Sequence, residues 1–427
     1  MSPVVAIGEF LEAVRGRPLR VFAICLFGLV LSNIDQSFFG YAIPGMVNEF
    51  AVGIDVIGYV LAISFVCAAA FSLPIGIAAD RYGRRRVFAV CMVVPAFLVG
   101  LTGLAPDIVS LTIVRAAAFT FTAALVPLAT TYVVEVTPDK FRGLFAGLLQ
   151  LGYPLGWFIA SLISAPMLAE FGWRSIFLPA FLVVPFGIWL TRRLPESERF
   201  VMQQTAAAPA TGWLGHMAVL GEPILRRRII LVTTMMFFHA GAYAGLAFFL
   251  PTFLTQARGY AEADAAMATG LSYLIGVVGY LGAGIVGEFY MTRRNTVGVW
   301  LTIGLGSFLG FIWLADTPLA NVLWFGLMTV FFFGVAVVQW PLGAELFPTR
   351  ARATAAAITG AGVMLGFAFY PVFVSQLVPV YGWETSLTAV IVPSLVLAII
   401  SVMCLDNTRS GASLDAVARD DVTAPTV

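Results

Sequence analysis

The amino-acid sequence predicts an all-α, polytopic membrane protein with twelve transmembrane helices in two pseudo-symmetric six-helix bundles. Three observations support this prediction: the composition, the spacing of the apolar runs and an internal repeat. Of the 427 residues, 60% are hydrophobic and 11% are charged, whereas soluble proteins average about 25% charged residues. The chain therefore has too little polar surface for a soluble enzyme or a disordered protein, and its net charge of +1 leaves no basic surface for nucleic acid.

Twelve apolar runs of membrane-spanning length follow one another along the chain. A helix needs about 20 apolar residues to cross a bilayer, and these runs are continuous, unlike the alternating strands of a membrane β-barrel. The predicted spans are residues 21–43, 57–79, 87–105, 108–133, 144–165, 174–193, 229–250, 268–287, 296–315, 319–343, 354–376 and 385–404.

The basic residues predict the orientation of these spans. Of the 24 Lys and Arg residues, all except Arg115, Arg174 and Arg258 fall in segments on one side of the membrane. The positive-inside rule makes that side cytoplasmic, with both termini there, in a multi-pass protein of the cytoplasmic or inner membrane. The predicted domains are an N-terminal bundle (1–193), a cytoplasmic linker (194–228), a C-terminal bundle (229–405) and a cytoplasmic tail (406–427).

The two bundles repeat each other at offsets of 208 to 210 residues. Two six-helix bundles in parallel repeat are a common transporter architecture, with the substrate site between the halves near the membrane midplane. The repeated elements are Gly76–x3–Asp80 before Arg84 with Gly284–x3–Glu288 before Arg293, Glu135–x2–Pro138–x3–Arg142 with Glu345–x2–Pro348–x3–Arg352, and Phe171-Gly172-Trp173 with Tyr381-Gly382-Trp383.

The segment from Gly76 to Arg86 resembles the G-x-L-x-D-R-x-G-R-R/K loop between spans 2 and 3 of the major facilitator superfamily. The resemblance implies transport by alternating access, in which this cytoplasmic loop helps to hold the outward-facing state. Acids beside helix N-termini and arginines beside C-terminal carbonyls make favourable contacts that a moving interface can break. The alternative is a plain solvated, positively charged loop. The gating candidates are Gly76, Asp80, Arg81, Gly83, Arg84, Glu135, Arg142, Glu288, Glu345 and Arg352.

Two further motifs resemble one branch of that superfamily. The stretch 195–200 is similar to the P-E-S-P-R motif after span 6 of sugar porters and of organic-ion and organic-acid symporters. The stretch 345–352 is similar to the E-x-x-P-T-x-x-R loop after span 10 in the same branch.

Span 1 is similar to that of the aromatic acid:proton symporters, whose pattern is D-G-Y/F-D-x4-G-x3-P. Asp35, Gly40 and Pro44 match the second Asp, the Gly and the Pro, whereas Ser32 and Asn33 replace the first Asp and the Gly. Because of this departure, the metabolite:proton symporters are equally good relatives.

Asp35 and Arg115 are predicted to lie at nearly the same depth inside the membrane. Asp35 is about 14 residues into span 1, and Arg115 is about seven residues from the outer end of span 4, at 1.5 Å per residue in a core about 30 Å thick. Charges at this depth are costly and need a reason. The functional hypothesis is that Asp35 carries the coupled proton, released or retained according to whether Arg115 or an anionic substrate is beside it. The alternative is a structural ion pair.

Other polar side chains are predicted at the depth of a central cavity. His239, near the midplane of span 7, could bind substrate or carry a proton, or it could be a structural histidine bonded to a neighbouring helix. The 36 phenylalanines are expected to be mostly lipid-facing. Each neutral candidate could equally be a helix–helix contact. The substrate-binding candidates are Arg115, His239, Gln36, Gln150, Tyr153, Tyr243, Gln339 and Tyr370.

The sequence thus predicts a proton-coupled symporter that imports a small organic acid, because Arg115 is the fixed positive charge expected inside the membrane. The alternatives are a transporter of a neutral solute such as a sugar, a proton-driven exporter, and a non-transporting membrane sensor. No nucleophile–base pair, metal-ligand cluster or phosphate loop occurs in the sequence, so we expect no enzyme activity, cofactor or metal. The expected partners are the substrate, protons and the lipid bilayer, without nucleic acid, for a monomeric protein.

Overall fold

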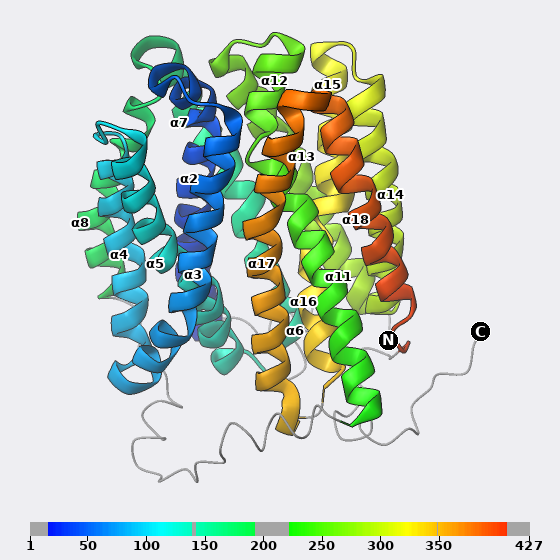
Figure 1. Ribbon diagram of the computed structural model, residues 1–427. Helices are drawn as coiled ribbons and strands as arrows, with labels where there is room; N and C mark the ends of the chain where they lie inside the picture. The colour runs from blue at the N-terminus through cyan, green and yellow to red at the C-terminus, as the bar shows by residue number, and fades with distance from the viewer. Residues whose placement is uncertain (1–15, 139–141, 193–221, 348, 408–427) are drawn as a thin grey trace.

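The computed structural model is an elongated bundle of helices, with the first half of the chain on one side and the second half on the other (Figure 1). In the part of the chain that the structure describes, all regular secondary structure is helical. Most of the predicted linker and nearly all of the predicted tail fall outside that part. The described residues are 16–138, 142–192, 222–347 and 349–407.

The helices of the first half account for the first six predicted spans. They are α2 (Arg17–Phe50), α3 (Ile54–Tyr82), α4 (Arg84–Thr102), α5 (Ile108–Val136), α6 (Arg142–Leu148), η2 (Leu149–Leu151), α7 (Gly152–Phe171), η3 (Ser175–Phe177) and α8 (Ala180–Thr191).

The helices of the second half follow the same order, with the span at 318–345 interrupted by η4. They are α11 (Pro223–Ala247), α12 (Leu250–Arg258), α13 (Glu262–Phe289), α14 (Arg293–Leu314), α15 (Pro318–Met328), η4 (Thr329–Phe333), α16 (Ala336–Glu345), α17 (Thr349–Tyr381) and α18 (Trp383–Met403).

The twelve-span prediction is confirmed. Among the described residues, eleven helices are long and apolar enough to cross a membrane, and a shorter apolar helix, Ser175–Thr191, supplies the remaining span. Several helices are longer than predicted, since α2 has 34 residues and α17 has 33. Large hydrophobic side chains such as Phe71, Leu182 and Val278 are exposed on the outside, as expected where lipid covers them.

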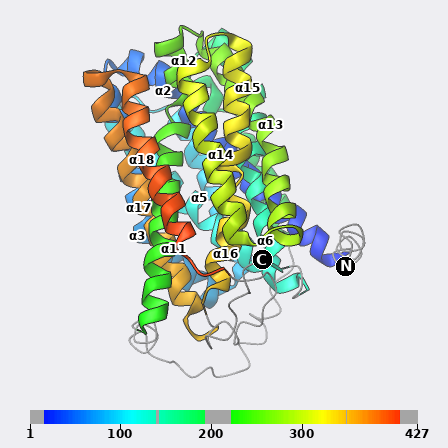
Figure 2. The same cartoon turned by 90° about the vertical axis from the view of Figure 1, so that its right-hand side faces the viewer.

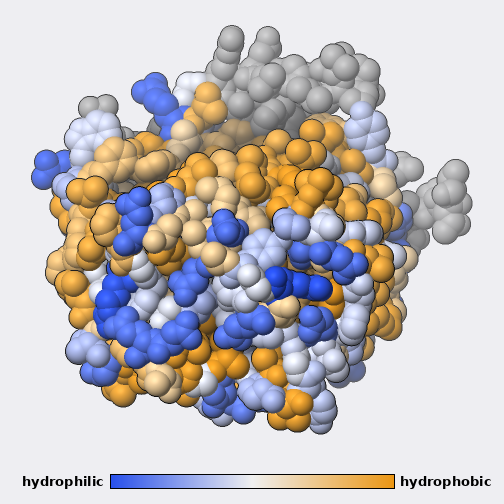
Figure 3. Space-filling view, turned by 90° about the horizontal axis from the view of Figure 1, so that it is seen from above, coloured by the Kyte–Doolittle hydropathy of each residue, from blue (hydrophilic) through white to orange (hydrophobic). Residues whose placement is uncertain are grey.

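The bundle has two ends, which we name by what they carry. The linker end holds the last residues of α8 and the first of α11, and it is at the bottom of Figure 1. The distal end holds the loops from α2 to α3 and from α12 to α13, at the top. Seen from the distal end, polar side chains gather over the middle of the face within a largely hydrophobic rim (Figure 3).

The two halves meet where α3 packs on α17 and where α7 packs on α13. At each crossing a glycine faces a serine: Gly58 faces Ser375, and Gly270 faces Ser161. A methyl group at either glycine would collide with the opposite serine, so the small residues permit the close approach of the two halves. In the second half, α14 and α18 also run side by side, as Figure 2 shows.

The repeated glycines of the sequence motifs sit at turns that need a left-handed backbone. Gly172 and Gly382 have φ of 74° and 77°, and Gly83, between α3 and α4, has φ of 97°. Side chains other than glycine rarely adopt these angles. The Phe/Tyr-Gly-Trp repeat is therefore the same turn used twice.

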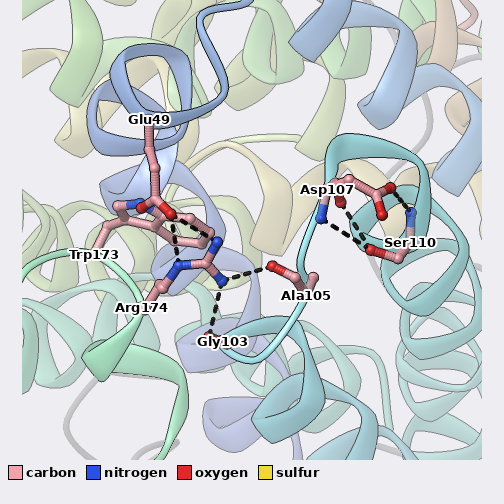
Figure 4. Close-up of polar contacts among 7 residues, drawn as sticks. All are labelled: Glu49, Gly103, Ala105, Asp107, Ser110, Trp173 and Arg174. Atoms are coloured by element: carbon pink, nitrogen blue, oxygen red, sulfur yellow. Dashed lines mark hydrogen bonds and ion pairs between the residues drawn. The ribbon is translucent and has the colours of Figure 1, made fainter.

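Trp173 and Arg174 follow the first of these turns and fasten the distal end of the first half (Figure 4). The indole Nε1 of Trp173 donates to Glu49 at 2.7 Å, and Arg174 donates to the same carboxylate through Nε and Nη2 at 2.9 and 2.8 Å. Arg174 Nη1 also donates to the carbonyls of Gly103 and Ala105 at 3.2 and 2.6 Å. One arginine thus joins the ends of α2 and α4.

The second half contains a neutral counterpart of this anchor. Trp383, the repeat partner of Trp173, donates from Nε1 to Gln256 at 3.1 Å. The carbonyl at the end of α14, from Ile312, accepts a hydrogen bond of 2.6 Å from Arg258. The two halves therefore share the Trp anchor, but their arginines, Arg174 and Arg258, come from positions that the repeat does not relate.

Replacing Arg174 with alanine is expected to lower the melting temperature of the detergent-purified protein by about 2–4 °C. The carbonyl bonds account for most of this loss, because the Glu49–Arg174 side chains are 47% and 31% exposed and water screens their ion pair. The matched control is Arg226→Ala, at an exposed arginine of the linker end. Equal melting temperatures for the two variants would contradict the anchoring role.

Candidate functional site

Asp35 of α2 and Arg115 of α5 form an ion pair inside the first half. Arg115 also donates from Nη2 to the Asp35 carbonyl at 3.3 Å, and the Thr122 hydroxyl donates to Asp35 Oδ2 at 3.3 Å. The guanidinium carbon lies 4.4 Å from the ring centroid of Phe119 and 4.8 Å from that of Phe39. With 0% of its surface exposed, Arg115 is a cation enclosed by rings and neutralised by one carboxylate.

Helical periodicity explains how these side chains come together. Arg115, Phe119 and Thr122 are four and three residues apart and lie on one face of α5, while Asp35 and Phe39 are one turn apart on α2. The contact predicted from membrane depth is therefore present, whereas the role of the pair in proton coupling stays a prediction.

A π-helical segment, η4, interrupts the span formed by α15 and α16. Such segments are rare and are often found at functional sites. Near its end the Phe332 carbonyl bonds His239 Nε2 at 2.9 Å. Because a carbonyl only accepts, Nε2 carries the hydrogen, and Nδ1 has no partner among the described residues. His239 is thus fastened to the irregular segment through one nitrogen.

Five aromatic side chains from both halves form what we call the central aromatic cluster: Tyr153, Trp157, Tyr243, Tyr273 and Phe333. Tyr153 meets Tyr243 edge to face at 6.1 Å between centroids, and Trp157 stacks on Tyr273 at 4.9 Å and 16°. Phe333, from η4, lies 4.5 Å from Tyr243 and 5.7 Å from Tyr273. The cluster therefore joins α7 of the first half to α11, α13 and η4 of the second.

At the linker end, each half contains an ion pair between the start of one span and the end of the next. Arg84, the first residue of α4, pairs with Glu135 of α5. Arg293, the first residue of α14, pairs with Glu345 of α16 and also with Glu288 at 2.5 Å. These are residues of the repeated motifs, so the repeat extends to the contacts themselves.

The next arginine in each half binds the C-terminal end of a helix. Arg85 donates to the carbonyls of Thr191, the last residue of α8, and of Arg192, which follows it, at 3.2 and 3.0 Å. Arg294 donates to the carbonyl of Met403 at 2.5 Å, at the end of α18. A positive charge at this position is favourable because the free carbonyls of a helix end carry partial negative charge.

The family model of the Major Facilitator Superfamily matches residues 25–344, which is well over half of the chain. The chain belongs to the major facilitator superfamily. It is accordingly a multi-pass membrane transporter and not an enzyme.

Several transport proteins are similar in sequence. A putative niacin/nicotinamide transporter, NiaP, of Bacillus subtilis is 24% identical over 359 residues, which covers 84% of this chain and 88% of the relative. A cis,cis-muconate transport protein of Acinetobacter baylyi is 24% identical over 340 residues (78% and 81%). A 4-hydroxybenzoate transporter, PcaK, of Pseudomonas aeruginosa is 28% identical over 188 residues (43% and 41%).

Two solved transporter structures show the same fold. A D-xylose-proton symporter aligns with a TM-score of 0.71 at 17% identity, covering 90% of this chain and 96% of that one. A bacterial homologue of the human lysosomal transporter Spinster aligns with a TM-score of 0.68 at 17% identity, covering 90% and 95%.

Within this superfamily fold, the predicted substrate-binding residues do not all gather at one place. Tyr153 and Tyr243 are in the central aromatic cluster, and His239 contacts η4 beside it. Tyr370 instead shares a hydrogen bond of 2.7 Å with Ser394 of α18. The remaining candidates are buried amides: Gln36, Gln150 and Gln339.

Some of the predicted gating residues form the expected contacts, and others lie outside what the structure describes. The ion pairs of Arg84 and Glu135, and of Glu288 and Glu345 with Arg293, are present. Gly83 occupies its turn, Gly76 faces open space, and Arg81 is exposed over the ring of Tyr82. The side chains of Asp80, Arg142 and Arg352, and the motif at 195–200, lie outside what the structure describes.

Sequence reasoning missed Trp157, Tyr273 and Phe333. The expectation that phenylalanines are mostly lipid-facing is wrong for the described residues, where more of them are buried than exposed. An available signal was the spacing of Tyr153 and Trp157, one helical turn apart beside small residues.

Arg115 is also not the sole buried arginine of the described chain. Arg228 and Arg293 are 8% and 6% exposed, but they lie at the linker end. Arg228 pairs there with Asp406 at 2.9 Å. Arg115 differs from both because it is enclosed in the interior of the first half.

Replacing Asp35 with leucine is expected to destabilise the protein by about 3–5 kcal/mol, because it leaves the buried guanidinium without a counter-charge. The double variant Asp35→Leu with Arg115→Met removes both charges and should recover most of that stability. Melting temperatures in detergent check both outcomes. A single variant as stable as the wild type would show that Arg115 does not depend on Asp35.

Proposed function

We propose that the chain is a proton-coupled symporter that imports a small aromatic acid, or a related carboxylate, by alternating access across the cytoplasmic membrane. The observation that carries this proposal is the enclosed Asp35–Arg115 ion pair. It supplies one group that can take a proton and one cation whose charge cannot be lost. Ionisable residues inside a membrane-spanning bundle are costly, and they usually mark a substrate site or a proton path.

Electroneutrality links the proton to the substrate. In the resting state the two charges cancel. A proton on Asp35 leaves a net positive charge in an apolar interior, and an entering monocarboxylate leaves a net negative one; each is unfavourable alone. When both bind, the charges cancel again. The pair therefore favours one proton for each monocarboxylate.

The relatives and the central aromatic cluster support an aromatic substrate. The names of the similar proteins include niacin, 4-hydroxybenzoate and muconate, all of them small organic acids. Tyr153, Tyr243 and Phe333 offer ring edges and faces of the kind that pack on a flat ring.

The linker-end ion pairs support alternating access, with this end and both termini in the cytoplasm. They join neighbouring spans through contacts that involve single side chains, which a two-state movement can make and break. The concentration of arginines at this end agrees with the positive-inside rule.

A neutral substrate is the second candidate. Both terminal nitrogens of Arg115 are already bonded to Asp35, and among the described residues no arginine is found over a ring of the central aromatic cluster. If the substrate is neutral, the Asp35–Arg115 pair has a structural role, and the protein carries an uncharged solute such as nicotinamide or a sugar.

Asp35→Asn is expected to abolish accumulation driven by an inside-alkaline pH gradient while sparing substrate counterflow in proteoliposomes. Asparagine can still accept from Arg115 but cannot exchange a proton. Nicotinate, 4-hydroxybenzoate, cis,cis-muconate and xylose would be tested with a pH dye in the lumen. Acidification of the lumen by one or more of the acids, but not by xylose, supports the proposal. Acidification by none of the four substrates, or full accumulation by Asp35→Asn, contradicts it.

Electroneutral binding of one proton and one monocarboxylate has a separate, measurable consequence. Uptake of a monocarboxylate by the wild type should respond to the pH gradient and not to an imposed potassium-diffusion potential, since no net charge moves. A rate that changes severalfold with membrane potential would rule out one proton for each monocarboxylate.

Reversing one charge at the linker end should slow transport, and reversing both should restore part of it. Arg84→Glu and Glu135→Arg each place like charges together, whereas the double variant re-forms an ion pair with exchanged ends. We expect the single variants to lose about tenfold in initial uptake rate. Wild-type rates in both would remove the ion pair from the transport cycle.

A further inference from the structure

Two buried hydrogen-bond donors of the central aromatic cluster make no hydrogen bond of normal geometry. They are the indole Nε1 of Trp157 and the hydroxyl of Tyr273. Their residues are 1% and 0% exposed, so bulk solvent does not supply the missing acceptor. Buried donors are nearly always paired, and an unpaired one needs an explanation.

The two donors belong to different halves and lie close together. Trp157 is on α7 and Tyr273 is on α13, and their rings stack at 4.9 Å. The hydroxyl of Tyr243, on α11, is a neighbouring acceptor that both donors face, but neither donor reaches it with normal hydrogen-bond geometry. Three polar groups thus converge within walls of aromatic rings.

We propose that this convergence is the site that holds the carboxylate of an aromatic acid, with Trp157 Nε1 and Tyr273 Oη each donating to one carboxylate oxygen. This inference rests on the proposed function and adds the group that recognises the substrate. The aromatic ring of the ligand packs on the rings of Tyr153, Tyr243 and Phe333.

The chemistry of the site selects the ligand class. Indole N–H is a donor only, so it requires an acceptor, and a carboxylate offers two oxygens that accept together. The two donors of the site, an indole and a hydroxyl, are neutral, and the positive charge that balances the anion is that of Arg115 once Asp35 is protonated. The substrate anion is therefore recognised by neutral donors and compensated at a distance.

The location of the donors adds a consequence for the transport cycle. A carboxylate bonded to both would bridge α7 and α13, the helices at which the halves cross with Gly270 against Ser161. Binding energy is then available only when the halves approach, so the ligand favours closure around itself.

The test uses Trp157→Phe and Tyr273→Phe in the full-length protein, because each keeps a ring and removes one donor. Equilibrium binding of nicotinate and benzoate would be measured in detergent at pH 5.5, beside nicotinamide. We expect each variant to weaken binding of both acids by about tenfold, with little change for nicotinamide.

A second measurement separates a binding role from a structural one. Removing an unpaired buried donor should leave the melting temperature of the ligand-free protein unchanged or higher. A lower value would show that the donor has a structural partner and would overturn the proposal. The control is Trp300→Phe, because the Trp300 indole on α14 is also unpaired but outside the cluster; it should bind both acids normally.

The outcomes distinguish this inference from the proposed function. Wild-type binding of nicotinate and benzoate by both variants would overturn the donor site even if proton-driven uptake is intact. Conversely, weakened binding in the variants would uphold the donor site even if uptake by the wild type proves independent of protons. If the variants lose as much affinity for nicotinamide as for the acids, the site recognises any carbonyl oxygen, and the proposal of a carboxylate site is wrong.

Discussion

The enclosed guanidinium of Arg115 is the constraint to which the first half is built. A permanent cation within an apolar bundle is tolerable only if something cancels its charge. Asp35 provides the charge and two of the acceptors, and the rings of Phe39 and Phe119 cover the faces. Because the pair sits between α2 and α5, these helices must stay in contact, and any event that alters the Asp35 charge acts on the packing of both.

The cost of charge in an apolar medium also explains where the other arginines lie. At the linker end they pair with acids of neighbouring spans or bind free carbonyls at helix ends, in the same way in both halves. At the distal end Arg174 and Arg258 do the same with α4 and α14. The arginines thus connect neighbouring spans at both ends of the bundle, where the free carbonyls of helix ends need hydrogen-bond donors.

The features that sequence could predict are those set by one helix at a time. Counting residues along a span gives depth, and this placed Asp35 beside Arg115; a repeated motif gives symmetric contacts, and this indicated Glu135 and Glu345. The Trp157–Tyr273 stack depends on how α7 crosses α13, which no single-helix pattern encodes. The π-helical turn at Thr329–Phe333 is likewise set by packing, since an ordinary α-helical period would place Phe332 and Phe333 elsewhere.

Pseudo-symmetry holds at the ends of the molecule and fails at its centre, and this difference has mechanistic meaning. The first half carries a charged pair in its interior; the second half offers His239, bonded to a backbone carbonyl, and aromatic hydroxyls. If each half had a buried ion pair, two carboxylates would compete for the proton that compensates the charge of one substrate anion. Under the proposed function, one pair in the first half and one aromatic cluster between the halves let the proton and the anion balance each other, while the symmetric ends open and close.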